Sequence, residues 1–298
     1  MGGSHSAKFA DKFLVSTQEL AAELFEGEAK QEEFKLKKDV TKHVRVLDAS
    51  LGGKAAKDKF LETAIPTACF VDVMTELADK SGKFPNTLPT PEIVKTVMEN
   101  LGIGKNDNIV LYGQQGKISG ATRAYFILSV YGFKNVRVLD GGLKKYVDEG
   151  LPTVKGEEYT GAKSKVTGLK LPQHKVAYYE EMKEFSEGKL PDIQLVDCRP
   201  ASGFNGNADD NIEGCRQGNI PGAINVPASE LLNADTQTFK NEEEIKQIVE
   251  KYNIDPAKRT ITMCRTGVAA SSGYFAFLRS GFKHLEIYDG SWSEFGSL

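Results

Sequence analysis

The sequence is poor in the residues that build disulfide or metal frameworks. Among 298 residues there are four histidines and four cysteines, and no two cysteines form a CxxC pair. This excludes a disulfide scaffold and argues against a zinc site. Reduced thiols in a cytosol-like compartment fit best, with a mitochondrial location as the alternative. The histidines show no ligand spacing, so we assign them no role. The cysteines are Cys69, Cys198, Cys215 and Cys264.

Long apolar runs and an excess of one charge are also missing. The longest nearly apolar run, residues 124–133, has half the length of a bilayer span, so we expect no membrane span. The net charge is −3 without a basic stripe, and we expect no nucleic acid partner. The N-terminus lacks the apolar core of a signal peptide and does not resemble a transit peptide. Residues 1–6 match the N-myristoylation pattern at Gly2, which we interpret as a cloning remnant or a chance match.

What the sequence does contain is an internal repeat. Asp48 and Asp197 are separated by 149 positions, and so are Asp140 and Asp289. Such matches in one order at a near-constant offset indicate a duplicated domain of half the chain. The matching segments are 44–48 with 193–197, 64–68 with 219–223, 108–112 with 260–264, and 138–142 with 287–291.

Each half alternates short β-branched runs with helical stretches, which predicts parallel sheets. We therefore predict an α/β fold of two tandem domains, each a parallel sheet flanked by helices on both faces. The domains are expected at 14–150 and 174–298. Residues 151–173 follow neither period and are predicted to form the linker. We expect a monomer.

Cys264 is the strongest candidate for a reactive group. It follows the predicted strand 260–263, where parallel sheets place their ligand sites, and a helix is expected from Val268. Loop N–H groups, the helix dipole and Arg265 should lower its thiol pKa below the free value of about 8.5. A buried cysteine that only packs is the alternative. Gly267 and the small residues after it leave room around the sulfur, which favours the reactive thiol.

The segment Met263-Cys264-Arg265-Thr266-Gly267-Val268-Ala269 resembles the active-site loop of rhodanese-type sulfurtransferases. Residues 288–294 (YDGSWSE) and 218–223 (GNIPGA) resemble two further family motifs, and the resemblance runs from about residue 14 to 295. It implies the tandem two-domain form, in which only the C-terminal repeat carries the nucleophile. The first domain is then catalytically inactive, with Tyr112 expected where Cys264 stands in the second.

The resemblance implies a ping-pong cycle through a Cys264 persulfide. A small-molecule donor such as thiosulfate loads the sulfur, and cyanide, a thiol or a thioredoxin-like dithiol protein removes it. Neither a metal nor an organic cofactor is implied. The substrate-binding residues are then Arg265, Thr266, Gly267, Val268, Ala269 and Trp292.

Several departures from the family pattern concern the donor. Gly203 stands where members usually have an anion-binding arginine, and Ile212 or a neighbour stands where mercaptopyruvate enzymes have a second one. Ala64 replaces a histidine of that branch. Arg265 is typical of thiosulfate enzymes, which usually have Lys in place of Thr266. We therefore favour thiosulfate over mercaptopyruvate, with weak donor affinity.

Other polar residues leave two interpretations open. Arg199 and Arg216 are candidates either for anion binding or for structural pairing. Asp289 and Ser291, with Trp292, form either a pocket wall or a simple turn. Cys198 is either a resolving thiol or a packing residue. Asp48 and Asp197 recur at equivalent strand ends, which favours a structural role for both.

Two other functions are alternatives for a cysteine loop of this kind. A phosphatase or arsenate reductase needs an arginine six residues after the cysteine, and Ala270 occupies that position, which excludes the phosphate clamp. A non-catalytic module for persulfide sensing or protein binding stays open, because the arginine is missing at Gly203.

Overall fold

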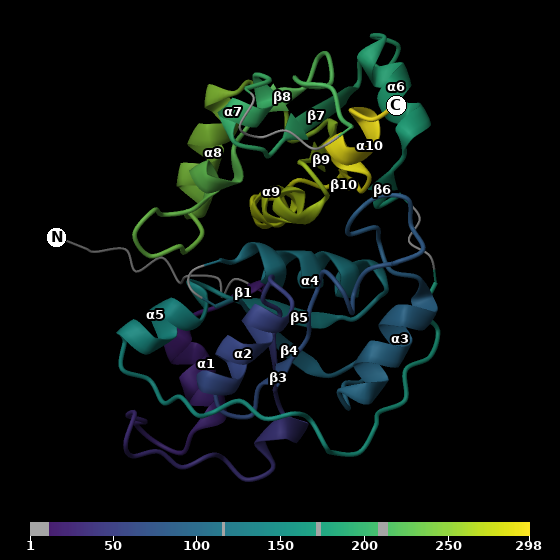
Figure 1. Cartoon of the computed structure of the whole chain (residues 1–298). Coiled ribbons are helices and arrows are strands. Elements are labelled where there is room, and N and C mark those ends of the chain that lie inside the picture. Colours follow the sequence, from purple (N-terminus) through teal and green to yellow (C-terminus); the bar gives the residue numbers. More distant parts are fainter. Residues whose placement is uncertain (1–11, 115–116, 171–173, 208–213) are drawn as a thin grey trace, which may run out of the picture.

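The computed structural model describes residues 12–114, 117–170, 174–207 and 214–298. They form two α/β domains, one above the other in Figure 1, each built on a five-stranded parallel sheet. The strand order is β1-β5-β4-β2-β3 in the first sheet and β6-β10-β9-β7-β8 in the second. The second sheet thus repeats the first strand for strand. The predicted α/β fold with two tandem domains is confirmed.

The strands are short, with two to five residues each. Those of the N-terminal domain are β1 (Leu14–Val15), β2 (Arg45–Asp48), β3 (Cys69–Phe70), β4 (Asn108–Tyr112) and β5 (Asn135–Leu139). Those of the C-terminal domain are β6 (Val176–Ala177), β7 (Ile193–Asp197), β8 (Ile224–Asn225), β9 (Arg259–Met263) and β10 (Leu285–Tyr288).

Helices cover both faces of each sheet. The first domain has α1 (Thr17–Leu24), the 3-10 turn η1 (Val40–Lys42), α2 (Lys54–Glu62), α3 (Pro91–Asn100), α4 (Ser119–Val130) and α5 (Gly142–Asp148). The second has α6 (Tyr179–Ser186), α7 (Ala201–Phe204), η3 (Ala228–Leu231), α8 (Glu242–Lys251), α9 (Val268–Arg279) and α10 (Ser291–Phe295). None of the helices in the described ranges is long and apolar enough to span a bilayer.

Local sequence explains where the helices begin. Asn241 caps α8, accepting the Glu244 N–H, and the Glu244 carboxylate in turn accepts the Asn241 N–H. This reciprocal pair satisfies two amides that would otherwise lack partners. The Thr90 side chain caps α3 by accepting the Ile93 N–H, and Pro91 occupies the first helical position, where its missing N–H costs nothing.

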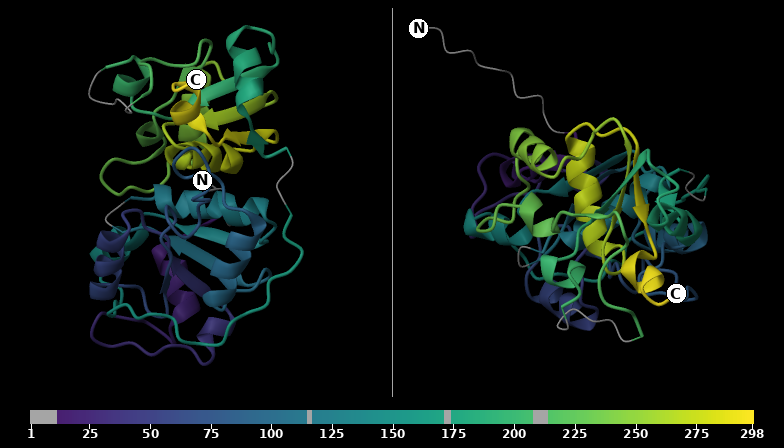
Figure 2. Two further views of the ribbon diagram at one scale, coloured as in Figure 1. Left: turned by 45° about the vertical axis from the view of Figure 1, so that its right-hand side comes forward. Right: turned by 90° about the horizontal axis from the view of Figure 1, so that it is seen from above.

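The helices α4 and α9 pack against each other across the boundary between the domains (Figures 1 and 2). Both are buried nearly all round, as expected of helices that are packed on a sheet on one side and on another helix on the other. Their aromatic rings pack edge to face, Tyr125 with Phe275 at 4.8 Å and Phe126 with Tyr274 at 5.1 Å. Each such pair contributes about 0.5–1.5 kcal/mol beyond the buried area. The two domains therefore share one apolar interface.

Residues 151–170 run along the outside of the N-terminal domain without helix or strand (Figure 1). Val154 pairs with Ala64 through two backbone hydrogen bonds of 2.8 and 2.9 Å, and the Ser164 N–H donates to the Glu99 carbonyl at 3.1 Å. The connection between the domains is thus tied to the first of them.

Candidate active site

Cys264 is the first residue after β9, at the carboxyl edge of the second sheet. Four residues, 264–267, lead from the strand into α9. Gly267 closes this loop with φ +80°, and a Cβ there would lie 3.1 Å from the Asp289 carbonyl oxygen and 3.2 Å from Arg123 Nη1. Glycine is required at this position, because both the backbone conformation and the close approach disfavour a side chain.

The backbone of the loop turns inward around the sulfur. The N–H groups of Ala270, Thr266 and Ala269 hydrogen-bond to Cys264 Sγ. Thr266 and Ala269 belong to the predicted set, whereas Ala270 was not among the predicted site residues. Such amides stabilise negative charge on sulfur without carrying a charge themselves. The arrangement suits an anionic sulfur or a persulfide.

The expected low pKa of this thiol is wrong. The Cys264 residue is only 2% exposed, and burial raises the pKa of its thiol above the ordinary value although the loop amides oppose this. Burial disfavours the charged form, and here it outweighs the hydrogen bonds. The loop amides and the helix dipole can be inferred from the local sequence, whereas the loss of solvent around the sulfur depends on tertiary packing.

Ser291 anchors the main chain of Cys264. Its Oγ accepts the Cys264 N–H at 3.2 Å and donates to the Tyr288 carbonyl at 2.8 Å. The residue has φ +53°, in the left-handed region that costs a non-glycine residue about 1 kcal/mol or more. The next residue, Trp292, donates its N–H to the Cys264 carbonyl at 3.1 Å. The start of α10 therefore holds both polar groups of the Cys264 backbone.

Trp292 and the two candidate arginines form a packed cluster beside this contact. The Trp292 ring lies 4.6 Å from the Arg199 guanidinium carbon and donates from Nε1 to the Arg216 carbonyl at 3.2 Å. Arg199 is 3% exposed and binds both carboxylate oxygens of Asp197 as well as the Gly218 carbonyl. These contacts favour structural pairing for Arg199.

Arg216 is held in the same manner, because its Nη2 donates to the Phe295 carbonyl at 2.9 Å. The residue is nonetheless exposed, as is Arg265 at the loop. Gly203 lies in α7, and Ile212 falls outside the described residues. Ala64 is buried in the N-terminal domain, paired with the linker. Of the three arginines considered for donor binding, Arg265 and Arg216 are exposed, whereas Arg199 is buried.

Cys198 is a packing residue in this structure. It is 1% exposed, and its Sγ lies 2.5 Å from the point that a Cβ on Gly273 of α9 would occupy. Burial raises the pKa of the Cys198 thiol well above its ordinary value, and the neighbouring Cys264 adds to this. A thiol that stays protonated is a poor resolving nucleophile.

The N-terminal domain reaches the loop through residues that the sequence did not single out. Arg123, only 1% exposed, forms an ion pair with Asp289 at 2.7 Å. Asn86 Nδ2 donates to Thr266 Oγ1 at 2.9 Å, and the Leu88 N–H donates to Asp289 Oδ2 at 2.6 Å. The recurrence of Asp140 and Asp289 was the one available signal. Asp289 thus joins the two domains rather than lining a pocket.

The counterpart of Cys264 in the first domain is Gly113 and not Tyr112. Tyr112 lies opposite Asp48 in the sheet, as Met263 lies opposite Asp197. The Leu143 N–H donates to the Gly113 carbonyl, as the Trp292 N–H does to that of Cys264. Matching residues 108–112 with 260–264 therefore shifted the comparison by one position relative to the strand register.

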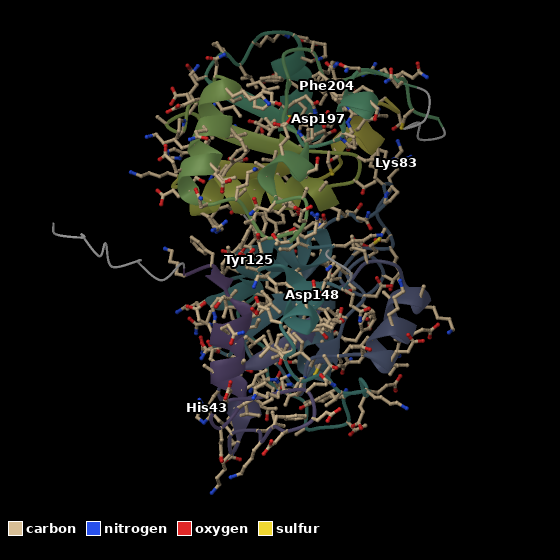
Figure 3. The ribbon with its side chains drawn as sticks, turned by 90° about the vertical axis from the view of Figure 1, so that its left-hand side faces the viewer. His43, Lys83, Tyr125, Asp148, Asp197 and Phe204 are labelled. Carbon is tan, nitrogen blue, oxygen red and sulfur yellow. The ribbon has the colours of Figure 1, made fainter. Side chains whose placement is uncertain are left out.

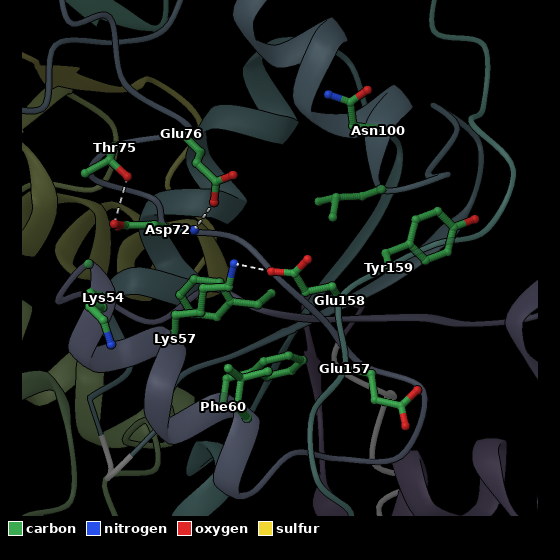
Figure 4. Close-up of a pocket in the computed structure, with 14 residues that line it drawn as sticks. Lys54, Lys57, Phe60, Asp72, Thr75, Glu76, Asn100, Glu157, Glu158 and Tyr159 are labelled. Carbon is green, nitrogen blue, oxygen red and sulfur yellow. Dashed lines mark hydrogen bonds and ion pairs between the residues drawn. The ribbon is translucent and has the colours of Figure 1, made fainter.

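A separate cavity of about 460 Å³ lies in the N-terminal domain (Figure 4). Phe60, Tyr159 and the ion pair of Lys57 with Glu158 line it, and none of its lining residues belongs to the Cys264 loop. No group of three or more His, Cys, Asp or Glu side chains in the described part of the chain is placed to hold a metal ion. The Cys264 loop is therefore the candidate active site.

Fold and site together define a tandem α/β protein with a thiol in an amide-lined loop after the central strand of its second domain. Ala270 stands where a phosphate-binding arginine would be required, so the loop is not of the phosphatase type. The chain belongs to the rhodanese family: the rhodanese-like domain matches it twice, at residues 30–149 and 179–298.

Named relatives agree with this family. The thiosulfate sulfurtransferase of Gallus gallus is 34% identical over 255 residues, covering 84% of this chain and 86% of the relative. The 3-mercaptopyruvate sulfurtransferase of Escherichia coli K12 is 28% identical over 265 residues, covering 85% and 89%. The crystal structure of SseA, a 3-mercaptopyruvate sulfotransferase from Escherichia coli, superposes with a TM-score of 0.76 at 25% identity, covering 95% of this chain and 99% of SseA. The protein is a sulfurtransferase of the rhodanese family.

Proposed function

We propose that the protein transfers a sulfane sulfur from thiosulfate to cyanide or a thiol, with Cys264 as the nucleophile. The observation that carries this proposal is the convergence of three backbone N–H groups on Cys264 Sγ. Arg265 adds an exposed cation at the same loop, which suits a doubly charged donor. Residues 265–269 would bind the donor, and Trp292 would act by holding the Cys264 carbonyl.

The first half-reaction is a displacement at sulfur. The Cys264 thiolate attacks the outer sulfur of thiosulfate, a new S–S bond forms, and the old S–S bond breaks as sulfite leaves with its electron pair. The product is a Cys264 persulfide, whose outer sulfur lies among the loop amides. Because a thiolate is the nucleophile, the buried and mostly protonated thiol must first lose its proton.

The second half-reaction returns the enzyme to its starting state. Cyanide or a thiolate attacks the outer sulfur, the S–S bond of the persulfide breaks, and Cys264 leaves as a thiolate. With cyanide the product is thiocyanate, and with a dithiol acceptor of the thioredoxin type the product is a persulfide on the acceptor. The two products leave in separate steps, as in other covalent mechanisms.

Mercaptopyruvate is the second candidate donor, because relatives such as the Escherichia coli protein are named for it. Arg265 and the absence of a histidine at Ala64 favour thiosulfate. A non-catalytic module that only carries a persulfide is the remaining alternative.

Steady-state rates with each donor, against cyanide and against a small dithiol, test the proposal. We expect thiosulfate to give the higher kcat/KM, and Cys264→Ser to abolish turnover with both donors. Cys69→Ala, which removes a buried thiol of the N-terminal domain, is the matched control and should keep wild-type rates. Turnover by Cys264→Ser would refute the mechanism. A persulfide that forms but never transfers would support the non-catalytic module.

A further inference from the structure

One segment of the non-catalytic domain lies against the Cys264 loop. It comprises residues 79–90, between β3 and α3, and we call it the crossing segment. Figure 1 shows it, in blue, rising from the N-terminal domain to the level of β6 and β10, and Figure 3 places its Lys83 beside the C-terminal domain. Its Leu88 N–H binds Asp289, at the end of the last strand of the other domain. The crossing segment is thus part of the interface that faces the candidate site.

Asn86 is the residue of the crossing segment whose side chain hydrogen-bonds to the loop. Its φ is +59°, a left-handed conformation that asparagine tolerates better than most residues. Its carbonyl accepts from Arg123 Nη2 at 2.6 Å, and Arg123 is itself fixed by Asp289. The side chain then extends to the catalytic domain, where Nδ2 donates to Thr266 Oγ1 at 2.9 Å. The backbone of Asn86 is held from one side while its amide contacts the loop on the other.

The repeat provides an internal comparison for this contact. The equivalent segment of the second domain, residues 230–241, donates the Phe239 N–H to Asp140 at 2.8 Å, as Leu88 does to Asp289. Its Gln237 has φ +54°, matching Asn86. The Gln237 side chain, however, donates to the Ala234 carbonyl of its own segment at 2.7 Å. The two segments therefore share a backbone conformation, but of these two side chains it is that of Asn86 that contacts the other domain, at the Cys264 loop.

We propose that Asn86 is a positioning residue for sulfur transfer, acting through the Thr266 hydroxyl. Because Thr266 Oγ1 accepts from Asn86, the hydroxyl directs its own proton elsewhere. The backbone N–H of Thr266 points at Cys264 Sγ, so the residue lies beside the sulfur. The hydroxyl proton of Thr266 is therefore available to a donor anion bound at the sulfur. The non-catalytic domain therefore sets the direction of one hydrogen bond in the site. This inference rests on the proposed transfer through Cys264.

Steady-state kinetics with thiosulfate and cyanide test the inference. We expect Asn86→Ala to raise KM for thiosulfate about tenfold, with a smaller change in kcat, because a hydrogen bond to an anion is misdirected. Asn86→Asp should raise KM further, since a carboxylate would accept the Thr266 proton and would also repel the anion. Gln237→Ala, at the matched position of the other repeat, should leave both constants unchanged.

A double-mutant cycle separates positioning from other effects. Thr266→Val removes the hydroxyl, and in that background Asn86→Ala should cause no further rise in KM. Alkylation of Cys264 by uncharged iodoacetamide, followed by mass spectrometry of its peptide, reports the thiol itself. Asn86→Ala should leave that alkylation rate at the wild-type value, whereas a distorted loop would change it.

The outcomes distinguish this inference from the proposed function. If wild type turns over and Asn86→Ala matches it in KM, or if the effects of Asn86→Ala and Thr266→Val are additive, the positioning role is refuted. An equal fall in alkylation and in transfer would also refute it, because it would show a structural role. If wild type fails to load sulfur on Cys264, the proposed function itself fails, and the inference falls with it.

Discussion

The two repeats share a scaffold and differ at one loop. Each last strand is followed by an aspartate that accepts a backbone N–H of the other domain, Asp140 from Phe239 and Asp289 from Leu88. The aromatic pairs between α4 and α9 are also symmetric, because each helix contributes one tyrosine and one phenylalanine and each tyrosine packs on the phenylalanine of the other helix. Duplication therefore preserved both the sheet and the surface that joins the two copies, which indicates that these were constrained by packing.

The loops after the central strands show the difference. The first loop, residues 113–118, begins with a glycine and has two residues more than the second, residues 264–267. Gly142, with φ +58°, stands where the second repeat has Ser291 with φ +53°. The backbone shape is the same, but only serine offers a hydroxyl to Cys264. The comparison teaches that the chemistry depends on a few side chains added to a common backbone.

The largest expected effect comes from moving the thiol to the other repeat. The double variant Cys264→Ser, Gly113→Cys should stay at least about a thousandfold below wild type in kcat/KM. The reason is that the first loop is two residues longer than the second and has no serine to anchor the cysteine backbone. The single variant Gly113→Cys is the control and should keep its activity, with a lower Tm because the new Cβ would lie 2.1 Å from the Lys117 carbonyl. Recovered transfer in the double variant would show that the loops are equivalent.

The next effect concerns pH. Since burial raises the pKa of Cys264, the thiolate fraction is small at neutral pH and grows as pH rises. We expect alkylation of Cys264 by iodoacetamide to rise about tenfold per pH unit and to keep rising beyond about 8.5, where a free cysteine levels off. Peptide mass spectrometry measures this rate, with an unstructured cysteine peptide as the control. A plateau at or below neutral pH would contradict the burial argument.

A smaller effect is expected from making the two repeats alike at the helix start. Ser291→Gly should lower kcat/KM about tenfold, because the Cys264 N–H loses its acceptor. Stability to denaturant should change by less than about 1 kcal/mol, since glycine relieves the strain at φ +53°.

The reverse change, Gly142→Ser, is the matched control. It should lower the free energy of unfolding by about 1–3 kcal/mol, because its Cβ would lie 2.5 Å from the Gly113 carbonyl, and it should leave transfer intact. Full activity in Ser291→Gly would show that the hydrogen bond between the Cys264 N–H and Ser291 is not needed for sulfur transfer.

The smallest effect on activity is expected at Arg199. Arg199→Lys should destabilise the protein by about 2 kcal/mol, because lysine cannot bind Asp197 and the Gly218 carbonyl together. KM for thiosulfate should stay within about twofold of wild type, since the guanidinium is engaged with the protein. Chemical denaturation and donor kinetics measure the two quantities. A tenfold higher KM at unchanged stability would instead place Arg199 in the anion site.

Much of the fold was predictable, because its signals are local. The repeat offset and the alternation of strands with helices indicated two parallel sheets, and the strand end marked Cys264. The one-residue error at Tyr112 arose because sequence matching aligns similar residues, whereas the register of hydrogen bonds decides which residues are equivalent. The sequence does not decide the pairing of Arg199 for a related reason, since Asp197 and the Gly218 carbonyl come together at its guanidinium only in the folded chain.

The sequence by itself determined the duplicated α/β architecture, the family and the cysteine on which the chemistry is proposed to depend, because periodicity and motif spacing are properties of neighbouring residues. The tertiary structure alone decided the protonation tendency of that cysteine and the residues that surround its loop. Burial depends on every element packed around the sulfur, and Asn86 meets Thr266 across 180 positions of the chain. Such contacts arise from the docking of two domains, which leaves no local pattern to find.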